Sequence, residues 1–262
     1  MDFALTLAAT VTIYKECALK AAWGIVKNWP ILIGSVVLFV SFFFIGSIFS
    51  IFGSLQGILM GLVSVAFLSI YYGWISAIAD KEIVTFQKLI KFDVGLFFNI
   101  MNVGFYLWIG DVIFKQSFER VPGMEWLPAC FGLVIFIVFN SLPEIVHQHR
   151  QDGMSSFYSA LNFNKENWIE WHIPLLIILS PILFSSWRAA LMLLSGASVL
   201  LPISTVMSVL LVTLSSFWLV SYITIFLALV VGNWYMLFRV FLFKELEGGT
   251  RRRRVYQAKQ KI

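Results

Sequence analysis

The sequence has few charged residues. Asp, Glu, Lys and Arg make up 13% of its 262 residues, whereas 60% are hydrophobic and 17% aromatic. Soluble domains carry about 25% charged residues, so this chain lacks roughly half of the side chains that normally cover a water-facing surface. This composition excludes a single soluble domain and indicates a chain that places most of its surface in lipid.

Cysteine and histidine are also scarce. Cys17 and Cys130 are expected on opposite halves of the protein, so we expect no disulfide between them. His147 and His149 are two residues apart, whereas metal-binding pairs on a helix usually stand four apart. The sequence has no nucleotide-binding or acyl-transfer motif in its usual context. We therefore predict no cofactor, no metal ion and no enzymatic activity.

Long uncharged runs, such as 31–52 and 214–231, dominate the rest of the sequence. A helix needs about 20 apolar residues to cross a bilayer, whereas the strands of membrane barrels alternate in short segments. The predicted fold class is an all-α integral membrane protein with about six transmembrane helices. The expected spans are 29–52, 55–78, 96–114, 127–146, 173–194 and 210–237.

Basic residues are unequally divided between the two sides of this arrangement. With six spans, both termini lie on one side, and the opposite side holds only Lys115, Arg120 and Arg188. Because cytoplasmic loops carry the excess of Lys and Arg, we predict a multi-pass protein of the cell inner membrane with both termini in the cytoplasm. Residues 1–28 lack the order of regions that marks a signal peptide, so none is expected.

Three segments on the predicted cytoplasmic side are amphipathic and too short to span. The first lies before residue 28, and the others are 84–92 and 154–163. Helices of this kind lie in the headgroup region or dock a partner. Their candidate docking residues are Phe86, Leu89 and Ile90 in the second segment and Phe157 and Leu161 in the third.

These segments also resemble one another. Residues 85–93 align with 156–164, Phe97 then falls on Trp168, and 27–29 resembles 166–168. The pattern predicts three repeated units, each a surface helix, an aromatic anchor and a hairpin of two spans. The units cover about 5–79, 80–148 and 149–244 of a single transmembrane domain, 1–244, which a basic cytoplasmic tail, 245–262, follows.

Two acidic residues fall inside or near predicted spans, where polar side chains usually have a function. Asp111, near the outer end of the third span, is expected to reach the outer headgroups. Glu144, near the inner end of the fourth, is expected to pair with Arg150 or Lys91 and hold the cytoplasmic ends together.

Further candidates lie at the cytoplasmic surface. Trp168 and Trp171 fit either an aromatic belt or a docking surface for a cytoplasmic partner. The tail carries Arg251, Arg252, Arg253 and Arg254, which are expected to fix topology and bind anionic lipid; no nucleic-acid partner is expected. The outer stretch 188–210 fits a re-entrant helical hairpin or a plain loop equally well.

Two resemblances bear on function. Around Leu142-Pro143-Glu144 and 156–171, the chain resembles the DUF4013 and YciC-like families of membrane proteins, which implies an architecture and no particular activity. The plan of spans, with surface segments at 13–27, 85–92 and 188–210, resembles the permease subunits of ABC-2 type exporters, from which the extra surface helix at 155–164 departs.

The sequence thus leaves two functions open. One is a non-enzymatic membrane subunit or scaffold that docks a protein partner or membrane lipids through its amphipathic helices. The other is an exporter permease, which implies a separate ATPase as partner because this chain has no nucleotide motif.

Overall fold

The computed structural model describes residues 3–118, 121, 123–124, 126–185, 198–214 and 221–249. In this part of the chain all regular structure is helical, which confirms the predicted all-α class. The helices are α1 (Phe3–Lys27), α2 (Pro30–Phe49), the 3-10 helix η1 (Ser50–Leu55), α3 (Gln56–Ala79), α4 (Phe86–Leu89), α5 (Val94–Phe118), α6 (Leu127–Val138), α7 (Leu142–Gln148), α8 (Gly153–Ser185), α10 (Pro202–Leu214) and α11 (Ser221–Glu247).

Three helical stretches among the described residues are long and apolar enough to cross a membrane. They are Pro30–Ala79, Phe86–Phe118 and Thr224–Glu247. The helices α6 and α7 are bent by 46° relative to each other, and they add a fourth stretch if the bent pair is one span.

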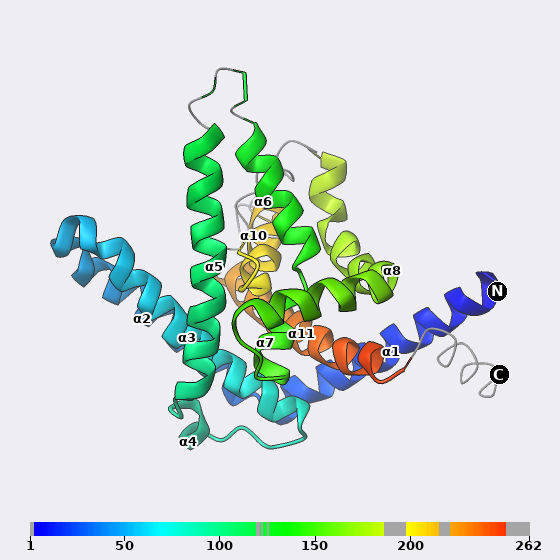
Figure 1. Ribbon diagram of the computed structural model, residues 1–262. Helices are drawn as coiled ribbons and strands as arrows, with labels where there is room; N and C mark the ends of the chain where they lie inside the picture. The colour runs from blue at the N-terminus through cyan, green and yellow to red at the C-terminus, as the bar shows by residue number, and fades with distance from the viewer. Residues whose placement is uncertain are drawn as a thin grey trace.

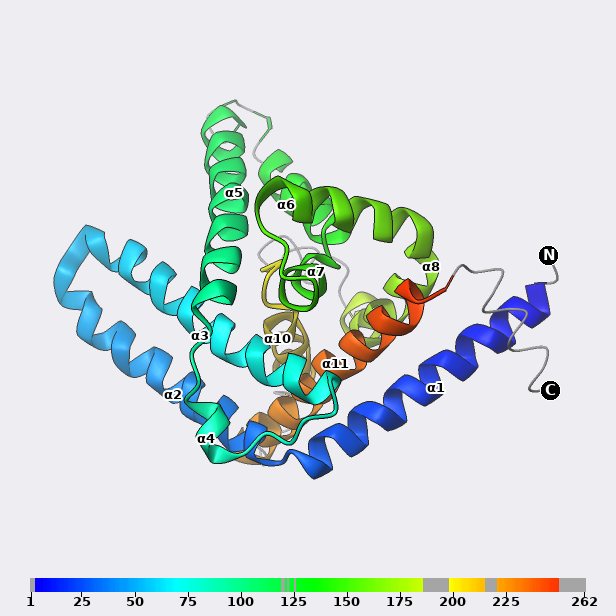
Figure 2. The same ribbon diagram turned by 60° about the horizontal axis from the view of Figure 1, so that its bottom comes forward.

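The helices α2 and α3 form a hairpin that extends away from the other helices (Figures 1 and 2). Its turn contains Gly53, whose φ of +55° lies in the left-handed region that favours glycine. The distal half of the hairpin exposes large apolar side chains, including Phe43, Phe44 and Ile51. Its other half reaches the core, where Tyr72 and Ile75 are fully buried.

A second hairpin is formed by α5 and α6, which lie side by side in both views (Figures 1 and 2). The rings of Phe114 and Phe131 stack across it, with centroids 3.9 Å apart and planes 7° from parallel. Aromatic stacking at this distance holds the distal ends of the two helices together.

Helix α1 lies against α11 and contacts α8. The Trp234 indole donates a hydrogen bond to the Ala18 carbonyl at 3.2 Å, and the Tyr14 hydroxyl donates to the Glu170 carbonyl at 2.6 Å. Cys17 and Ala21 are fully buried in this contact. The first predicted surface segment, before residue 28, therefore lies in α1, and one side of this helix packs on the bundle.

Helix α8 joins two elements that the sequence predicts as separate helices, the surface helix 154–163 and the start of the span 173–194. Its one non-helical residue is Asn167 (φ −122°, ψ 22°), whose side chain donates to the Phe163 carbonyl at 3.1 Å. Asn28, at the turn between α1 and α2, donates in the same way to the Gly24 carbonyl at 2.9 Å. The two asparagines that the repeat alignment pairs thus make the same bond at corresponding junctions.

Other predicted boundaries differ from the structure. The last span was expected to cover 210–237, but α11 continues to Glu247 and α10 already ends at Leu214. The segment 84–92 contains only the four-residue helix α4. Of the outer stretch 188–210, the part before residue 198 lies outside the described residues, as does the tail from residue 250 onward.

Candidate functional site

A break in the helical segment 127–148 lies at the centre of the candidate site. Pro143 follows the break, and a proline removes one backbone donor and clashes with the carbonyl four residues earlier. Helix α6 therefore ends at Val138 and α7 begins at Leu142. A helix that ends inside the protein leaves its last carbonyl groups without helical partners.

Side chains from two other helices bind these carbonyl groups. His172 Nε2 lies 3.0 Å from the Ile137 oxygen, and Asn164 Nδ2 donates to the Val138 oxygen at 2.5 Å; both come from α8. From α11, the Arg239 guanidinium donates to the Asn140 oxygen. Neighbouring helices thus supply the hydrogen bonds that the break removes, which is what makes a broken helix tolerable in an apolar setting.

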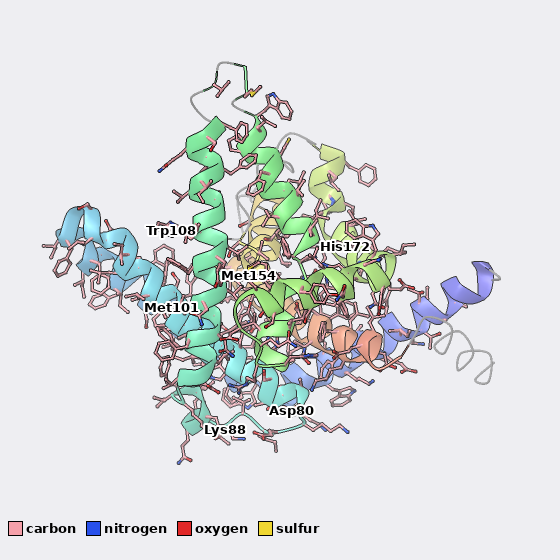
Figure 3. The ribbon with its side chains drawn as sticks, in the orientation of Figure 1. Asp80, Lys88, Met101, Trp108, Met154 and His172 are labelled. Atoms are coloured by element: carbon pink, nitrogen blue, oxygen red, sulfur yellow. The ribbon has the colours of Figure 1, made fainter. Side chains whose placement is uncertain are left out.

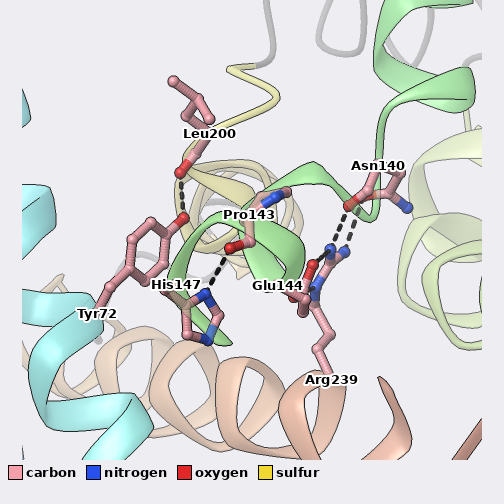
Figure 4. Close-up of polar contacts among 7 residues, drawn as sticks. All are labelled: Tyr72, Asn140, Pro143, Glu144, His147, Leu200 and Arg239. Atoms are coloured by element: carbon pink, nitrogen blue, oxygen red, sulfur yellow. Dashed lines mark hydrogen bonds and ion pairs between the residues drawn. The ribbon is translucent and has the colours of Figure 1, made fainter. Parts of the chain in front are cut away.

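Arg239 also forms a bidentate ion pair with Glu144 (Figure 4). Its Nε lies 2.7 Å from one carboxylate oxygen and its Nη2 lies 2.7 Å from the other, while Nη1 donates to Asn140 Oδ1 at 2.8 Å. The side chains of Arg239 and Glu144 are 3% and 0% exposed. Charged groups this deeply buried are tolerated only when they are paired and hydrogen-bonded, and both conditions hold here.

Aromatic rings enclose this ion pair. The guanidinium carbon of Arg239 lies 4.8 Å from the ring centroid of Trp171 and 5.7 Å from that of Tyr235. Trp171 packs in turn against Phe163 and Phe243. The rings contribute cation–π attraction and separate the charges from solvent.

A second contact ties α3 to the same region. The Tyr72 ring stacks on His147 with centroids 4.8 Å apart, and the Tyr72 hydroxyl donates to the Leu200 carbonyl. His147 Nδ1 lies 2.5 Å from the Pro143 carbonyl (Figure 4). We call the set formed by Asn140, Glu144, His147, Asn164, His172 and Arg239 the polar node.

The two charged members of the polar node are fully engaged with their partners. Both Glu144 oxygens are bound to Arg239, and the guanidinium makes four hydrogen bonds. Within the described residues no group of three or more His, Cys, Asp or Glu side chains is placed to hold a metal ion. The geometry fits a clamp that joins α7, α8 and α11.

The partner expected for Glu144 was wrong. Arg150 pairs with Asp93 at 2.6 Å, and Glu144 pairs with Arg239. Arg239 lies just beyond the predicted end of the last span at residue 237. Its position inside the apolar run 234–243 was the signal that could have revealed a buried charge needing an acidic partner.

Three other candidate residues, Asp111, Trp168 and Trp171, differ in how exposed they are to solvent. Asp111 forms an ion pair with Lys115, one helical turn further along α5, at 2.7 Å, and both side chains are about half exposed. Trp168 is exposed, but Trp171 is buried. The Trp171 ring covers Arg239 and is therefore exposed neither to an aromatic belt nor to a docking partner.

The remaining candidates divide between surface and interior. Phe86 and Ile90 are exposed on and next to α4, whereas Leu89 is half-buried. Leu161 is exposed, and Phe157 is half-buried, with its ring packed edge-on against Tyr106 and Phe139. The four consecutive arginines of the tail lie outside the described residues.

The described helices define an all-α protein with three or four stretches able to cross a membrane and an ion pair buried beside a broken helix. No family model, curated protein or solved structure matches the chain.

Proposed function

We propose that this chain is a non-enzymatic integral membrane subunit or scaffold of the cell inner membrane. It has six spans and cytoplasmic termini, and it docks a protein partner or lipid through its surface segments. The observation that carries the proposal is the exposed apolar surface around α4, formed by Ile83, Phe86, Ile90 and Phe92. We call this surface the α4 patch.

The α4 patch combines apolar side chains with charges of both signs. Ile90 is 83% exposed. Lys81, Lys88 and Lys91 stand among the apolar residues beside Asp80, Glu82 and Asp93, and Lys88 pairs with Glu82 at 2.7 Å. Exposed apolar surface of this kind marks a protein or membrane interaction site. Asp80 and Lys88 lie at the end of the molecule where α3 leads into α4 (Figure 3).

Contacts with α2 and with the turn between α1 and α2 fix the position of the α4 patch. Leu89 packs over Gly34 of α2, where an added Cβ would lie 3.1 Å from Leu89 and 2.8 Å from the buried Trp74 ring. The backbone N–H of Val84 donates to Asn28 Oδ1 at 2.7 Å. A fixed apolar surface loses little conformational entropy on binding, which supports a docking role.

The polar node supports a scaffold more than a conducting path. Its two buried charges are fully engaged with each other and with Asn140, so neither is free to bind a substrate or carry a proton. Intramembrane charges that serve transport usually face a water-filled cavity. A clamp between helices instead keeps the surface segments in fixed relative positions.

The second candidate is a permease subunit of an ABC-2 type exporter. It is favoured by the place of α4, between α3 and α5, where such permeases carry the helix that contacts their ATPase. Under this hypothesis the α4 patch binds a separate ATPase. That ATPase supplies the energy for transport, because this chain has no nucleotide-binding motif of its own.

Affinity purification in mild detergent, with mass spectrometry of the co-purifying chains, tests both candidates. The test variant combines Phe86→Ser with Ile90→Ser, because both side chains are exposed and their loss leaves the core intact. The control combines Ile51→Ser with Phe52→Ser, exposed residues at the distal turn of the α2/α3 hairpin.

The docking proposal predicts a stoichiometric partner that the control retains and the α4 variant loses. An ATPase as that partner establishes the exporter reading, and another protein establishes the scaffold reading. A partner that both variants retain contradicts docking through α4. If no protein co-purifies, unchanged binding of the α4 variant to anionic vesicles contradicts the lipid form of the proposal as well.

A further inference from the structure

A groove separate from the polar node runs along α5. Its volume is about 730 Å³, within the range of sites that bind small molecules. The walls come from α5, α6, the start of α8 and residues 198–200. The lining residues that matter here are Gly104, Trp108, Gly110, Asp111, Lys115 and Phe157.

Two glycines leave free space along the α5 wall of this groove. A Cβ at Gly110 would meet no atom within 4 Å, and one at Gly104 would meet only Leu200, at 3.6 Å. The Phe157 ring, packed edge-on against Tyr106, borders the groove at the α8 side. Trp108 on α5 and Met154 at the start of α8, both labelled in Figure 3, also line it.

The length of the groove matches one leaflet of a bilayer. Gly104 and Lys115 are eleven residues apart on α5, which at about 1.5 Å per residue corresponds to about 16 Å. Half of a hydrocarbon core about 30 Å thick is about 15 Å. An acyl chain of a lipid in one leaflet therefore has the length to lie along this wall.

The charged lining residues stand together at one end. Asp111 and Lys115 are 2.7 Å apart and half-exposed. An exposed pair of this kind contributes little to stability, so a ligand that carries both charges readily replaces the internal contact. A lipid with a single negative charge would gain from Lys115 but would be repelled by Asp111.

We propose that this groove binds a phospholipid whose zwitterionic headgroup carries an ammonium group and a phosphate. The ammonium group contacts Asp111, the phosphate contacts Lys115, and one acyl chain lies past Trp108 and Gly110 toward Phe157. The binding site goes beyond partner docking through α4 and does not depend on it.

The test is native mass spectrometry of the full-length protein in mild detergent, titrated with phosphatidylethanolamine and, separately, with phosphatidylglycerol. Gly110→Leu fills the groove. Gly57→Leu is its matched control, because a side chain at Gly57 on α3 also meets no atom within 4 Å but lies outside the groove. Asp111→Asn removes the proposed ammonium contact and keeps Lys115.

We expect the wild type and Gly57→Leu to bind phosphatidylethanolamine more tightly than phosphatidylglycerol. Gly110→Leu occupies the space of the acyl chain and Asp111→Asn removes a charged hydrogen bond, so each should weaken phosphatidylethanolamine binding by about tenfold. Asp111→Asn should also abolish the headgroup preference. Equal binding of the two lipids by the wild type, or an unchanged preference in Asp111→Asn, overturns the proposal even if Gly110→Leu fails to fold.

Discussion

At the scale of single residues, Arg239 and Glu144 show how this chain accommodates charge in an apolar interior. Each lies on a helix with mostly apolar neighbours, and each is buried with the other as its ion-pair partner. Taking both charges out of water is costly, so such a pair adds little net stability relative to apolar residues of the same size. Its effect is to specify how α7 and α11 are placed, because either charge alone would be left buried and unpaired.

Removing one member of this pair is therefore expected to be severe. We predict that Arg239→Met lowers the free energy of unfolding by about 3–5 kcal/mol, because Glu144 is left buried without a counter-charge. Adding Glu144→Gln to that variant should restore part of the loss. Thermal unfolding in detergent, followed as a double-mutant cycle, measures the coupling.

Arg150→Gln is the matched control for this cycle. It removes an equally short ion pair, with Asp93, but Arg150 is half exposed. The expected loss is about 0–1 kcal/mol. Equal losses for Arg239→Met and Arg150→Gln would contradict the clamp role of Arg239.

The two cysteines should differ in reactivity. Cys17 is fully buried between α1 and its neighbours, and this burial raises the pKa of its thiol to about 12, so the thiolate that reacts with maleimides is nearly absent at neutral pH. We predict that Cys130→Ser, which retains only Cys17, is not labelled while folded and is labelled fully after unfolding in detergent. Cys17→Ser, which retains the exposed Cys130, serves as the reference. Rapid labelling of folded Cys130→Ser would show that α1 does not pack on the bundle as described.

At the scale of elements, the break between α6 and α7 depends on side chains that are distant in sequence. Pro143 makes a break at this point understandable from the sequence alone. The groups that bind the freed carbonyl oxygens, His172, Asn164 and Arg239, come from α8 and α11. Each of these hydrogen bonds forms only when the helices pack together, so no local sequence pattern predicts it.

Asn164→Ala tests this account of the break. It leaves the Val138 carbonyl buried without a donor, and we predict a loss of about 1–3 kcal/mol in the free energy of unfolding. Asn162→Ala, on the exposed side of the same helix, should leave stability nearly unchanged. Thermal shift assays of the two purified variants compare them directly, and equal melting temperatures would mean that the break needs no donor from α8.

Periodicity and hydropathy predicted most helices of the described chain but placed several of their ends wrongly. The span expected to stop at 237 continues because Arg239 finds Glu144 and Asn140 in the interior, so charge does not end the helix there. Trp171 was assigned to the surface because tryptophan is common at membrane interfaces, whereas its ring covers Arg239. Both errors have one cause, a buried ion pair that forms only in the folded chain.

At the scale of the whole molecule, the proposed topology ties the surface features together. Six spans with cytoplasmic termini place the α4 patch on the cytoplasmic side and the Asp111–Lys115 pair on the other. The matching hydrogen bonds of Asn28 and Asn167 fit a chain built from repeated units that each begin with a surface segment. The docking proposal requires this sidedness, whereas the lipid-binding proposal requires only that α5 lies within the membrane.

Cysteine accessibility in intact cells tests the proposed topology most directly. In a background with Cys17→Ser and Cys130→Ser, single cysteines are introduced by Gln87→Cys on α4, Lys165→Cys on α8 and Ser117→Cys near the end of α5, all exposed positions. A membrane-impermeant maleimide is applied before and after permeabilisation. We predict labelling at 117 from outside and labelling at 87 and 165 only after permeabilisation; labelling of 87 and 117 from the same side would contradict a membrane-spanning α5 and a cytoplasmic docking surface.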